Sequence, residues 1–300
     1  MRIAISGSSG FIGTHLIHYL MKQHHEILLI TRTKKTASAP NRVSVTWNEL
    51  ELNSQPIEKL DAWINLAGES INQRWTATAK LRIVNSRINT IQQIAKLLEK
   101  IQTKPKVIVN SSATGIYGTS ETKTFTEQSI THSSDFLSDV VEQWEKATEL
   151  FKGTRVVRIR TGLVLGMDGG ALPSMVMPYR FGVGGRVGKG TQWISWIHIQ
   201  DLVQLFEYCI TMESLSGAVN ATSPNPVTMD QFGKTIAKVW HRPHLFPVPS
   251  FVLKLMFGEM SILVLEGQRV LPEVLLTQGY VFQYRELQAA LEQLHAVKKN

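Results

Sequence analysis

The chain has 300 residues, of which 43% are hydrophobic and 19% charged, and these are the proportions of an ordinary globular protein. Its single cysteine, Cys209, excludes an internal disulfide and fits a reducing cytoplasm. The formal net charge of +8 comes from basic residues spread along the chain, with no recognition helix and no zinc-ligand spacing. We therefore expect a cytoplasmic protein without nucleic-acid, membrane or metal partners, whose charge favours an acidic cofactor or substrate.

Apolar runs and helical patterns alternate through the first two thirds of the chain. Runs rich in Ile and Val predict strands at residues 2–6, 26–31, 43–47, 61–67, 106–112 and 155–160. Helical spacing predicts helices at 11–23, 78–100 and 136–145, the second with an apolar face formed by Leu81, Val84, Ile88, Ile91, Ala95 and Leu98. This alternation predicts an α/β fold, a Rossmann doubly wound parallel sheet.

The motif SGSSGFIG places Gly7, Gly10 and Gly13 directly after the first strand and at the start of the first helix. In a dinucleotide-binding turn the first glycine makes the turn, the second lets the backbone approach the pyrophosphate, and the third allows close helix–strand packing. The helix N-terminus then offers free N–H groups and partial positive charge to the phosphates. This placement favours a dinucleotide site over a turn that serves packing alone.

The residues after the second strand indicate which dinucleotide binds. An NAD site usually has an Asp or Glu there, which holds the ribose 2′-hydroxyl. No acidic residue occurs from Ile27 through Asn48, a stretch that instead contains Arg32, Lys34, Lys35 and Arg42. A guanidinium at Arg32 suits the extra 2′-phosphate of NADP. A merely solvated basic loop is the alternative, but the missing acid favours NADP.

The chain changes character after about Thr161, where glycine and proline become frequent. The glycine-rich loop at 181–190 and its flank carry Arg180, Arg186 and Lys189, which either close over an anionic substrate or form an ordinary solvated loop. The last region predicts helices with a strand at 280–284. We expect an NADP-binding Rossmann domain at 1–240, including the substrate-loop segments, and a smaller, mainly helical cap-like region at 241–300.

Several longer motifs resemble a known family. GSSGFIG, NLAGE (65–69) and SSATGIYG (111–118) look like an extended short-chain dehydrogenase/reductase of the NAD-dependent epimerase/dehydratase type. A closer resemblance, to the YfcH-like epimerase family with its C-terminal domain of unknown function, rests on QRW (73–75), SR (86–87), RTGLVLG (160–166), FGVGGRVGKGTQWISWIHIQDL (181–202) and GEMSILVLEGQRVLP (258–272). The resemblance covers nearly the whole chain and implies a Rossmann fold that binds NADP, without an agreed substrate.

The glycine motif, the basic residue after the second strand and the resemblance together imply the residues that line the cofactor. These are Gly7, Ser9, Gly10, Phe11, Ile12, Gly13, Arg32, Asn65, Leu66, Ala67, Gly68 and Ser86. Ser86 falls where related enzymes place a polar residue facing the cofactor, although simple solvent exposure is the alternative. By the same resemblance Ser112 is the residue that hydrogen-bonds a substrate, and Tyr117 belongs to the YG pair that follows the strand.

The helix at 136–145 lacks the catalytic pair of the wider class. Related enzymes carry a Tyr there with a Lys four residues later, and the corresponding residues are Leu137 and Val141, which cannot transfer a proton. None of the six tyrosines has a lysine four residues later. The candidates to replace the pair are Ser112, Tyr117 and Glu69, with an ordinary surface loop carboxylate as the equal alternative for Glu69. His198 is better explained as a hydrogen-bonded core residue, with Asp201 capping the following helix.

Two functions from different classes remain. One is an NADP-dependent oxidoreductase or nucleoside-sugar-epimerase-like enzyme with a substituted acid or base, acting on a small polar substrate, an anionic one included. The other is a catalytically silent NADP-binding sensor or scaffold. The missing pair favours the second, whereas Ser112 and the polar loops favour the first, which we prefer. The sequence indicates no oligomeric state.

Overall fold

The computed structural model describes residues 1–33, 41–131 and 133–297. The chain forms two compact units, each assembled from separate segments. Unit 1 comprises Met1–Ser112, Val140–Ile159 and Val203–Val219, and unit 2 comprises Ala113–Asp139, Arg160–Leu202 and Asn220–Asn300. The domain boundary expected between residues 240 and 241 stays a prediction.

A seven-stranded sheet has the strand order β11-β7-β5-β4-β1-β2-β3. Its strands are β1 (Arg2–Ser6), β2 (Glu26–Thr31), β3 (Arg42–Thr46), β4 (Ala62–Asn65), β5 (Val107–Ala113), β7 (Arg155–Thr161) and β11 (Gly217–Ala221). β1 pairs in parallel with β2 on one side and with β4 on the other. β2 pairs in parallel with β3, and β4 pairs in parallel with β5. This reversal of strand order at β1 is that of a doubly wound sheet, so the predicted Rossmann fold is confirmed.

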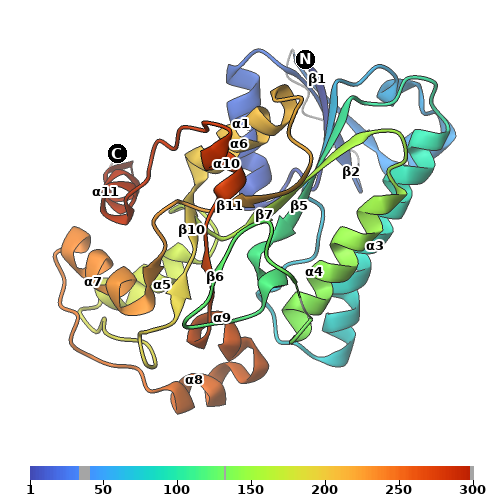
Figure 1. Cartoon of the computed structure of the whole chain (residues 1–300). Helices are drawn as coiled ribbons and strands as arrows, with labels where there is room; N and C mark the ends of the chain where they lie inside the picture. The colour runs from blue at the N-terminus through green and yellow to red at the C-terminus, as the bar shows by residue number, and fades with distance from the viewer. Residues whose placement is uncertain (34–40, 132, 298–300) are drawn as a thin grey trace. The chain divides into compact units, whose positions relative to one another are not determined.

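Helices cover both faces of this sheet. α3 (Ala77–Glu99) and α4 (Phe136–Ala147) lie on one face, and α1 (Phe11–Lys22) and α6 (Ile199–Thr211) lie on the other (Figure 1). The short α2 (Trp47–Leu52) begins with a capping box in which Thr46 and Glu49 bond each other's backbone N–H. The apolar sides of α3 and α4 pack on buried residues of β1, β2, β4 and β5, which form the core of unit 1.

Three sequence-based expectations were wrong in detail. Leu81 is 63% exposed, and the buried face of α3 instead includes Ile83, Ile94 and Leu97. The predicted face followed a strict 3.5-residue spacing, which drifts away from the 3.6-residue turn of a straight helix. Residues 280–284 form no strand, because the N–H groups of 283 and 284 donate to the carboxylate of Asp201 at 2.6 and 3.0 Å. Asp201 lies inside α6 and holds this segment, so it is not the cap of that helix.

Unit 2 contains short strand pairs and small helices. The pairs are β6 (Thr124–Phe125) with β13 (Arg269–Val270), β8 (Leu163–Leu165) with β10 (Trp196–His198), and β9 (Trp193–Ile194) with β12 (Val227–Thr228). The helices are α5 (Leu172–Arg180), α7 (Met229–Trp240), α8 (Ser250–Phe257), α9 (Ile262–Leu265), α10 (Glu273–Thr277) and α11 (Leu287–Val297). α5, α7 and α11 share one hydrophobic core, so the mainly helical C-terminal region is confirmed.

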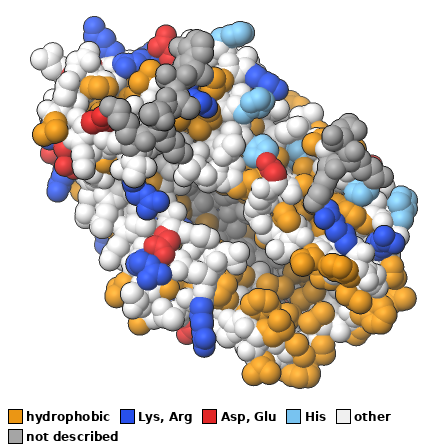
Figure 2. Space-filling model, turned by 180° about the vertical axis from the view of Figure 1, so that it is seen from behind, with side chains coloured by type: hydrophobic (Ala, Val, Ile, Leu, Met, Phe, Trp, Pro, Cys, Tyr) orange, Lys and Arg blue, Asp and Glu red, His pale blue; other side chains and the backbone are white. Residues whose placement is uncertain are grey.

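The surface of unit 2 exposes large hydrophobic side chains. On α8, Phe251, Leu255 and Met256 are all exposed, Leu255 at 87%. Hydrophobic side chains gather over this region at the lower right of Figure 2. Among the described residues no helix combines the length and hydropathy needed to cross a bilayer.

Candidate functional site

The glycine turn between β1 and α1 is shaped by two close approaches of the backbone to itself. Gly7 has a φ of +78°, and a Cβ there would lie 2.4 Å from the carbonyl carbon of Leu66. A Cβ on Gly13 would lie 2.7 Å from the carbonyl oxygen of Ser8. Because no side chain fits at such distances, the fold itself requires glycine at both positions.

Gly10 is in a different environment. Among the described atoms, a Cβ built on Gly10 would meet the Gly7 carbonyl oxygen alone, at 3.8 Å, which is an ordinary contact. Its φ of −78° is also open to any residue. Internal packing therefore does not require glycine at this position, and the space beside Gly10 fits the approach of a pyrophosphate.

The start of α1 offers hydrogen-bond donors beside that space. Gly10 is the N-cap residue and provides no side-chain cap, and the first turn contains no acidic residue. The first N–H groups of a helix have no partner within it, and they carry part of the positive end of the helix dipole. Ser9 is exposed, and Phe11 and Ile12 are half-buried. These residues fit a dinucleotide phosphate.

The end of β2 lies at the same edge of the sheet as the glycine turn. Ser6, the last residue of β1, is in register with Ile30 of β2 and with Asn65 of β4. Arg32 follows β2 directly and its side chain is exposed. Arg42 is the first residue of β3, whereas Lys34 and Lys35 lie outside the described residues. Arg32 is thus a cation available to a ligand at this edge.

Asn65 ends β4, and its side chain ties three strands together. Its Oδ1 accepts hydrogen bonds from the Ser6 hydroxyl at 2.8 Å and the Ala67 N–H at 3.2 Å, and its Nδ2 donates to Asn110 Oδ1 at 2.7 Å. Asn65 is fully buried. The side chain therefore fixes the start of the turn 66–69, and the backbone of Leu66 and Ala67 is held against Gly7.

The same turn is held from α3 by Ser86 and Arg82. The Ser86 hydroxyl accepts from the Glu69 N–H at 2.9 Å and donates to the Ile83 carbonyl at 3.0 Å. The Glu69 carboxylate accepts from Gln73 and from Arg82 Nε, both at 2.9 Å, and these bonds hold the pKa of Glu69 below its usual value. Ser86 thus supports the turn beside Gly68, and Glu69 is a carboxylate anion at neutral pH.

Ser112 has a buried partner that sequence reasoning missed. Its hydroxyl donates to Glu145 Oε1 at 2.6 Å, and the two residues are 4% and 5% exposed. The other carboxylate oxygen of Glu145 lies 3.9 Å from Arg158 Nη1. With its proton directed at Glu145, the Ser112 hydroxyl has its lone pairs left for a further hydrogen bond, as an acceptor.

Tyr117 is also committed to internal hydrogen bonds. Its hydroxyl donates to Asn220 Oδ1 at 2.8 Å and accepts from Arg160 Nη1 at 2.8 Å. Burial raises the pKa of Tyr117, and the neighbouring Arg160 offsets this only in part. A tyrosine with a raised pKa is a weaker acid, so this environment does not prepare Tyr117 for proton transfer.

α4 carries Leu137 and Val141 one turn apart on the same side. Val141 is buried and Leu137 is half-buried. The helix starts there because the Asp135 carboxylate accepts from the N–H groups of Leu137 and Ser138, at 2.8 and 2.9 Å. This face carries no ionisable group at either position, and their equivalence to the class's Tyr and Lys stays a prediction.

His198 lies in the core of unit 2. It is fully buried, its Nε2 lies 3.0 Å from Gln293 Oε1, and its Nδ1 accepts from the Gln200 N–H at 3.1 Å. The centre of its ring lies 4.0 Å from that of Tyr284, with the two planes tilted by 36°. These contacts confirm the hydrogen-bonded core role expected of this histidine.

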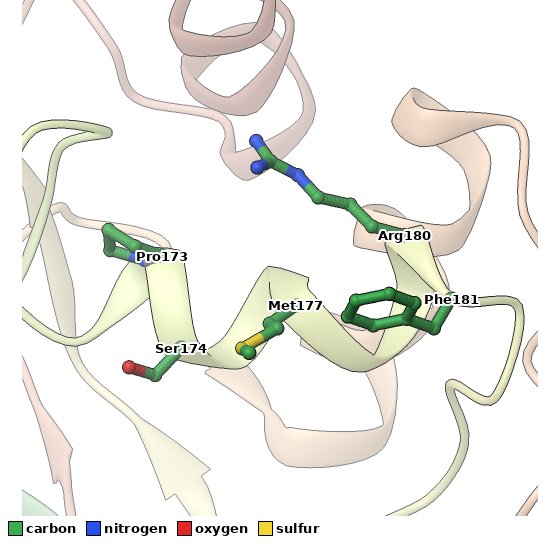
Figure 3. Close-up of a pocket in the computed structure, with 5 residues that line it drawn as sticks. All are labelled: Pro173, Ser174, Met177, Arg180 and Phe181. Atoms are coloured by element: carbon green, nitrogen blue, oxygen red, sulfur yellow. The ribbon is translucent and has the colours of Figure 1, made fainter.

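The basic residues around the glycine-rich loop have separate surroundings. Lys189 bonds Glu121 at 3.3 Å, and Arg180 borders a surface depression of ≈ 390 Å³ along α5. Figure 3 shows that the residues lining this depression come from α5 and the residue after it, with the Arg180 side chain directed away from Ser174. Its lining contains one charged residue and no acid–base pair, so this depression has no sign of catalytic chemistry.

Comparison with known proteins identifies the family. The model of the NAD dependent epimerase/dehydratase family matches residues 3–221, and that of a domain of unknown function (DUF1731) matches residues 248–294. The chain belongs to the NAD-dependent epimerase/dehydratase family. The resemblance seen in the sequence is thereby confirmed.

Individual proteins match over the whole of this chain or nearly so. The epimerase family protein YfhF of Bacillus subtilis is 46% identical, covering 100% of this chain and 99% of that protein. A crystal structure of the human epimerase family protein SDR39U1 with NADPH has a TM-score of 0.91 and 36% identity, covering 99% of each chain. A nucleoside-diphosphate sugar epimerase from Corynebacterium glutamicum has a TM-score of 0.78 and 28% identity, covering 100% of this chain and 62% of that one.

Two residues of this epimerase-family chain were missed by sequence reasoning. Glu145 follows Val141 by four residues on α4, so helical spacing alone would have placed a carboxylate on the face that lacks the Tyr and Lys. Arg87 contacts the turn 67–69 from α3. Its position next to Ser86 in the SR motif was noted, but a sequence does not show which of two adjacent helical residues turns inward.

Proposed function

We propose that this family member is an NADP(H)-dependent oxidoreductase or nucleoside-sugar-epimerase-like enzyme that acts on a small polar substrate. The observation that carries the proposal is Gly10, a glycine that internal packing does not require, at the open N-terminus of α1. NADPH in the structure of the 36% identical human relative supports the same cofactor here. When bound, this cofactor accepts or supplies a hydride.

The residues proposed to hold the cofactor form two groups. The backbone of the glycine turn and the start of α1 would bind the pyrophosphate, and Arg32 would bind the 2′-phosphate. The turn after β4 would line the rest, with Ser86 acting through its bond to the Glu69 N–H rather than by direct contact. The full set is Gly7, Ser9, Gly10, Phe11, Ile12, Gly13, Arg32, Asn65, Leu66, Ala67, Gly68 and Ser86.

The proton donor is proposed to be one of Ser112, Tyr117 and Glu69. Ser112 is favoured, because it is hydrogen-bonded to Glu145: a proton taken up by the Glu145 carboxylate would pass to the Ser112 oxygen as the hydroxyl proton is transferred to the substrate. Tyr117 is disfavoured by its raised pKa, and Glu69 by its lowered pKa, since it has no proton to donate at neutral pH.

A second candidate function is a catalytically silent NADP-binding sensor or scaffold. The observation that favours it is that the polar groups of Ser112 and Tyr117 are already hydrogen-bonded inside the protein. The two functions differ in turnover: an enzyme oxidises NADPH with its substrate, whereas a sensor binds NADPH without consuming it.

Calorimetric titration tests the proposed cofactor. NADPH should bind at least about tenfold more tightly than NADH, a difference of about 1.4 kcal/mol, because Arg32 contacts the 2′-phosphate. Arg32→Glu should remove most of this difference. Lys22→Glu, which makes the same charge change at the exposed end of α1, should leave it intact. Equal affinities for NADPH and NADH in the unmutated protein would refute the NADP assignment.

A further inference from the structure

Arg87 is a half-buried cation on α3 that touches the turn after β4. Its Nη1 donates to the carbonyl oxygens of Glu69 at 3.1 Å and Ile83 at 2.9 Å. The guanidinium lies so close to Gly68 that a Cβ there would be 3.1 Å from Cζ. Cζ also lies 4.8 Å from the centre of the Trp144 ring. The guanidinium therefore contacts both the turn and α4.

The charge of Arg87 lacks a carboxylate partner among the described residues. The nearest acidic side chain in its surroundings, Glu69, directs its carboxylate to Arg82 and Gln73. Burial lowers the pKa of Arg87 to about 10, and Glu69 offsets this only in part. Arg87 thus remains charged at neutral pH, in a place where a counterion would stabilise it.

Some hydrogen-bond donors of Arg87 have no acceptor among the described residues. Among the described residues its bonds all leave from Nη1, so Nε and Nη2 have no protein acceptor. In the described part of the chain, the buried side-chain atoms without a hydrogen-bond partner are Arg42 Nε, Trp144 Nε1 and Thr154 Oγ1. Nε and Nη2 of Arg87 are not among them. These two donors of Arg87 are therefore not fully enclosed by the protein.

Arg155 is a half-buried arginine of the same unit whose hydrogen bonds are structural. Its Nη1 donates to the carbonyl oxygens of Cys209 and Leu215, and its Nη2 donates to that of Ile210. Two nitrogens thus serve three carbonyls at and beyond the end of α6, and the guanidinium ties β7 to that helix. Arg87 differs because its second terminal nitrogen is left unused.

The position of Arg87 agrees with a role in substrate binding. Ligands of doubly wound sheets bind at the carboxyl ends of the strands, where the turn 66–69 lies. Trp144 follows Val141 by three residues on α4, so Arg87 brings a cation from α3 to the helix that lacks the lysine of the wider class. An arginine with Nε and Nη2 both free presents the planar fork that matches the two oxygens of a carboxylate or phosphate.

We propose that Arg87 binds an oxyanion of the substrate, a carboxylate or a phosphate group, beside the turn at 67–69. This proposal rests on the proposed function and narrows its substrate to an anionic compound. Arg87 is a binding residue in this scheme, and proton transfer is left to other groups.

The test measures oxyanion binding to protein saturated with NADPH, in which the phosphate sites of the cofactor are already occupied. The probes are inorganic phosphate and oxalate, titrated at constant ionic strength against chloride, with Kd obtained from calorimetry and from the rise in melting temperature. Arg87→Met should raise the Kd of the preferred probe by at least about 30-fold, since it removes one partner of a hydrogen-bonded charge pair. Arg87→Lys keeps the charge without the fork and should raise it by about tenfold.

Lys96→Met is the matched control, because it removes an exposed cation from the same helix, nine residues beyond Arg87. It should change the Kd by less than about threefold. A lower Kd for phosphate would indicate a phosphate ester as substrate. A lower Kd for oxalate would indicate a carboxylate. The inference is overturned if NADPH-saturated protein shows neither heat of binding nor a rise in melting temperature with either probe. It is also overturned if Arg87→Lys and any folded Arg87→Met bind the preferred probe as tightly as the unmutated protein. Failure of NADPH itself to bind would overturn the proposed function instead.

Discussion

The glycine turn at 7–13 and the helix α4 differ in what they leave available to a ligand. At the turn, Gly10 leaves open space beside the N–H groups that start α1. On α4, Val141 is buried, Glu145 accepts a hydrogen bond from the Ser112 hydroxyl, and Trp144 lies against Arg87. At the turn the missing side chain of Gly10 leaves space for a ligand, whereas the polar groups near α4 bond to other groups of the protein. Under the proposed function, the turn binds the cofactor and proton transfer depends on groups other than the usual pair.

The largest effect is expected from Gly10→Val. The valine side chain would occupy the space proposed for the pyrophosphate, so NADPH binding should be abolished. The fold should persist with a loss of about 1 kcal/mol in unfolding free energy, since valine is a poor N-cap but meets no close protein atom. Titration and urea denaturation of the same sample measure both.

Gly13→Val is the contrasting variant at the same turn. Its Cβ would lie 2.7 Å from the Ser8 carbonyl oxygen, so the unfolding free energy itself should fall by about 1–3 kcal/mol or more. If Gly10→Val kept full NADPH affinity, the role given to the glycine turn would be wrong.

Placing a Tyr and a Lys on α4 tests whether this helix faces the reacting part of the substrate. Leu137→Tyr with Val141→Lys should give measurable NADPH-dependent reduction of simple ketones, because a positioned general acid contributes about 10²–10⁴-fold. Leu137→Phe with Val141→Lys is the control, since it has the same buried charge and nearly the same volume without the hydroxyl. Equal rates from the two folded double variants would show that α4 does not face the reacting carbon.

A smaller effect is expected from Ser112→Ala. Removing the hydroxyl deprives the buried Glu145 carboxylate of its 2.6 Å hydrogen bond, so the unfolding free energy should fall by about 1–3 kcal/mol. Ser111 is the neighbour on the same strand and points to the other face, so Ser111→Ala should cost no more than about 0.5 kcal/mol. Denaturation curves that coincide for the two variants would contradict the Ser112–Glu145 pair.

The fold and the glycine turn were predictable because their causes are local. A parallel strand shows as a short run of apolar residues, and the requirement for glycine at Gly7 follows from a turn directly after such a run. The helix face of α3 was predicted only toward its C-terminal end, because the strict heptad spacing assigned to it departs from the true helical repeat.

The surroundings of the candidate catalytic residues were not predictable, because they depend on partners far along the chain. Ser112 pairs with Glu145, 33 residues away, and Tyr117 with Asn220, 103 residues away. A sequence pattern identifies residue types that can transfer protons, but the pairing that sets their pKa comes from the packing of separate elements. The strand predicted at 280–284 failed for the same reason, since the acceptor of its N–H groups is Asp201.

The most direct test of this contrast is the turnover of NADPH by the unmutated protein with a panel of simple ketones at neutral pH. Saturable NADPH binding is first established by titration in the same sample. We predict saturable binding accompanied by ketone reduction about 10²–10⁴-fold slower than that of enzymes with the Tyr and Lys pair. Brisk reduction of these ketones would contradict the account, because it would require an efficient proton donor that neither α4 nor the hydrogen-bonded Ser112, Tyr117 and Glu69 supply.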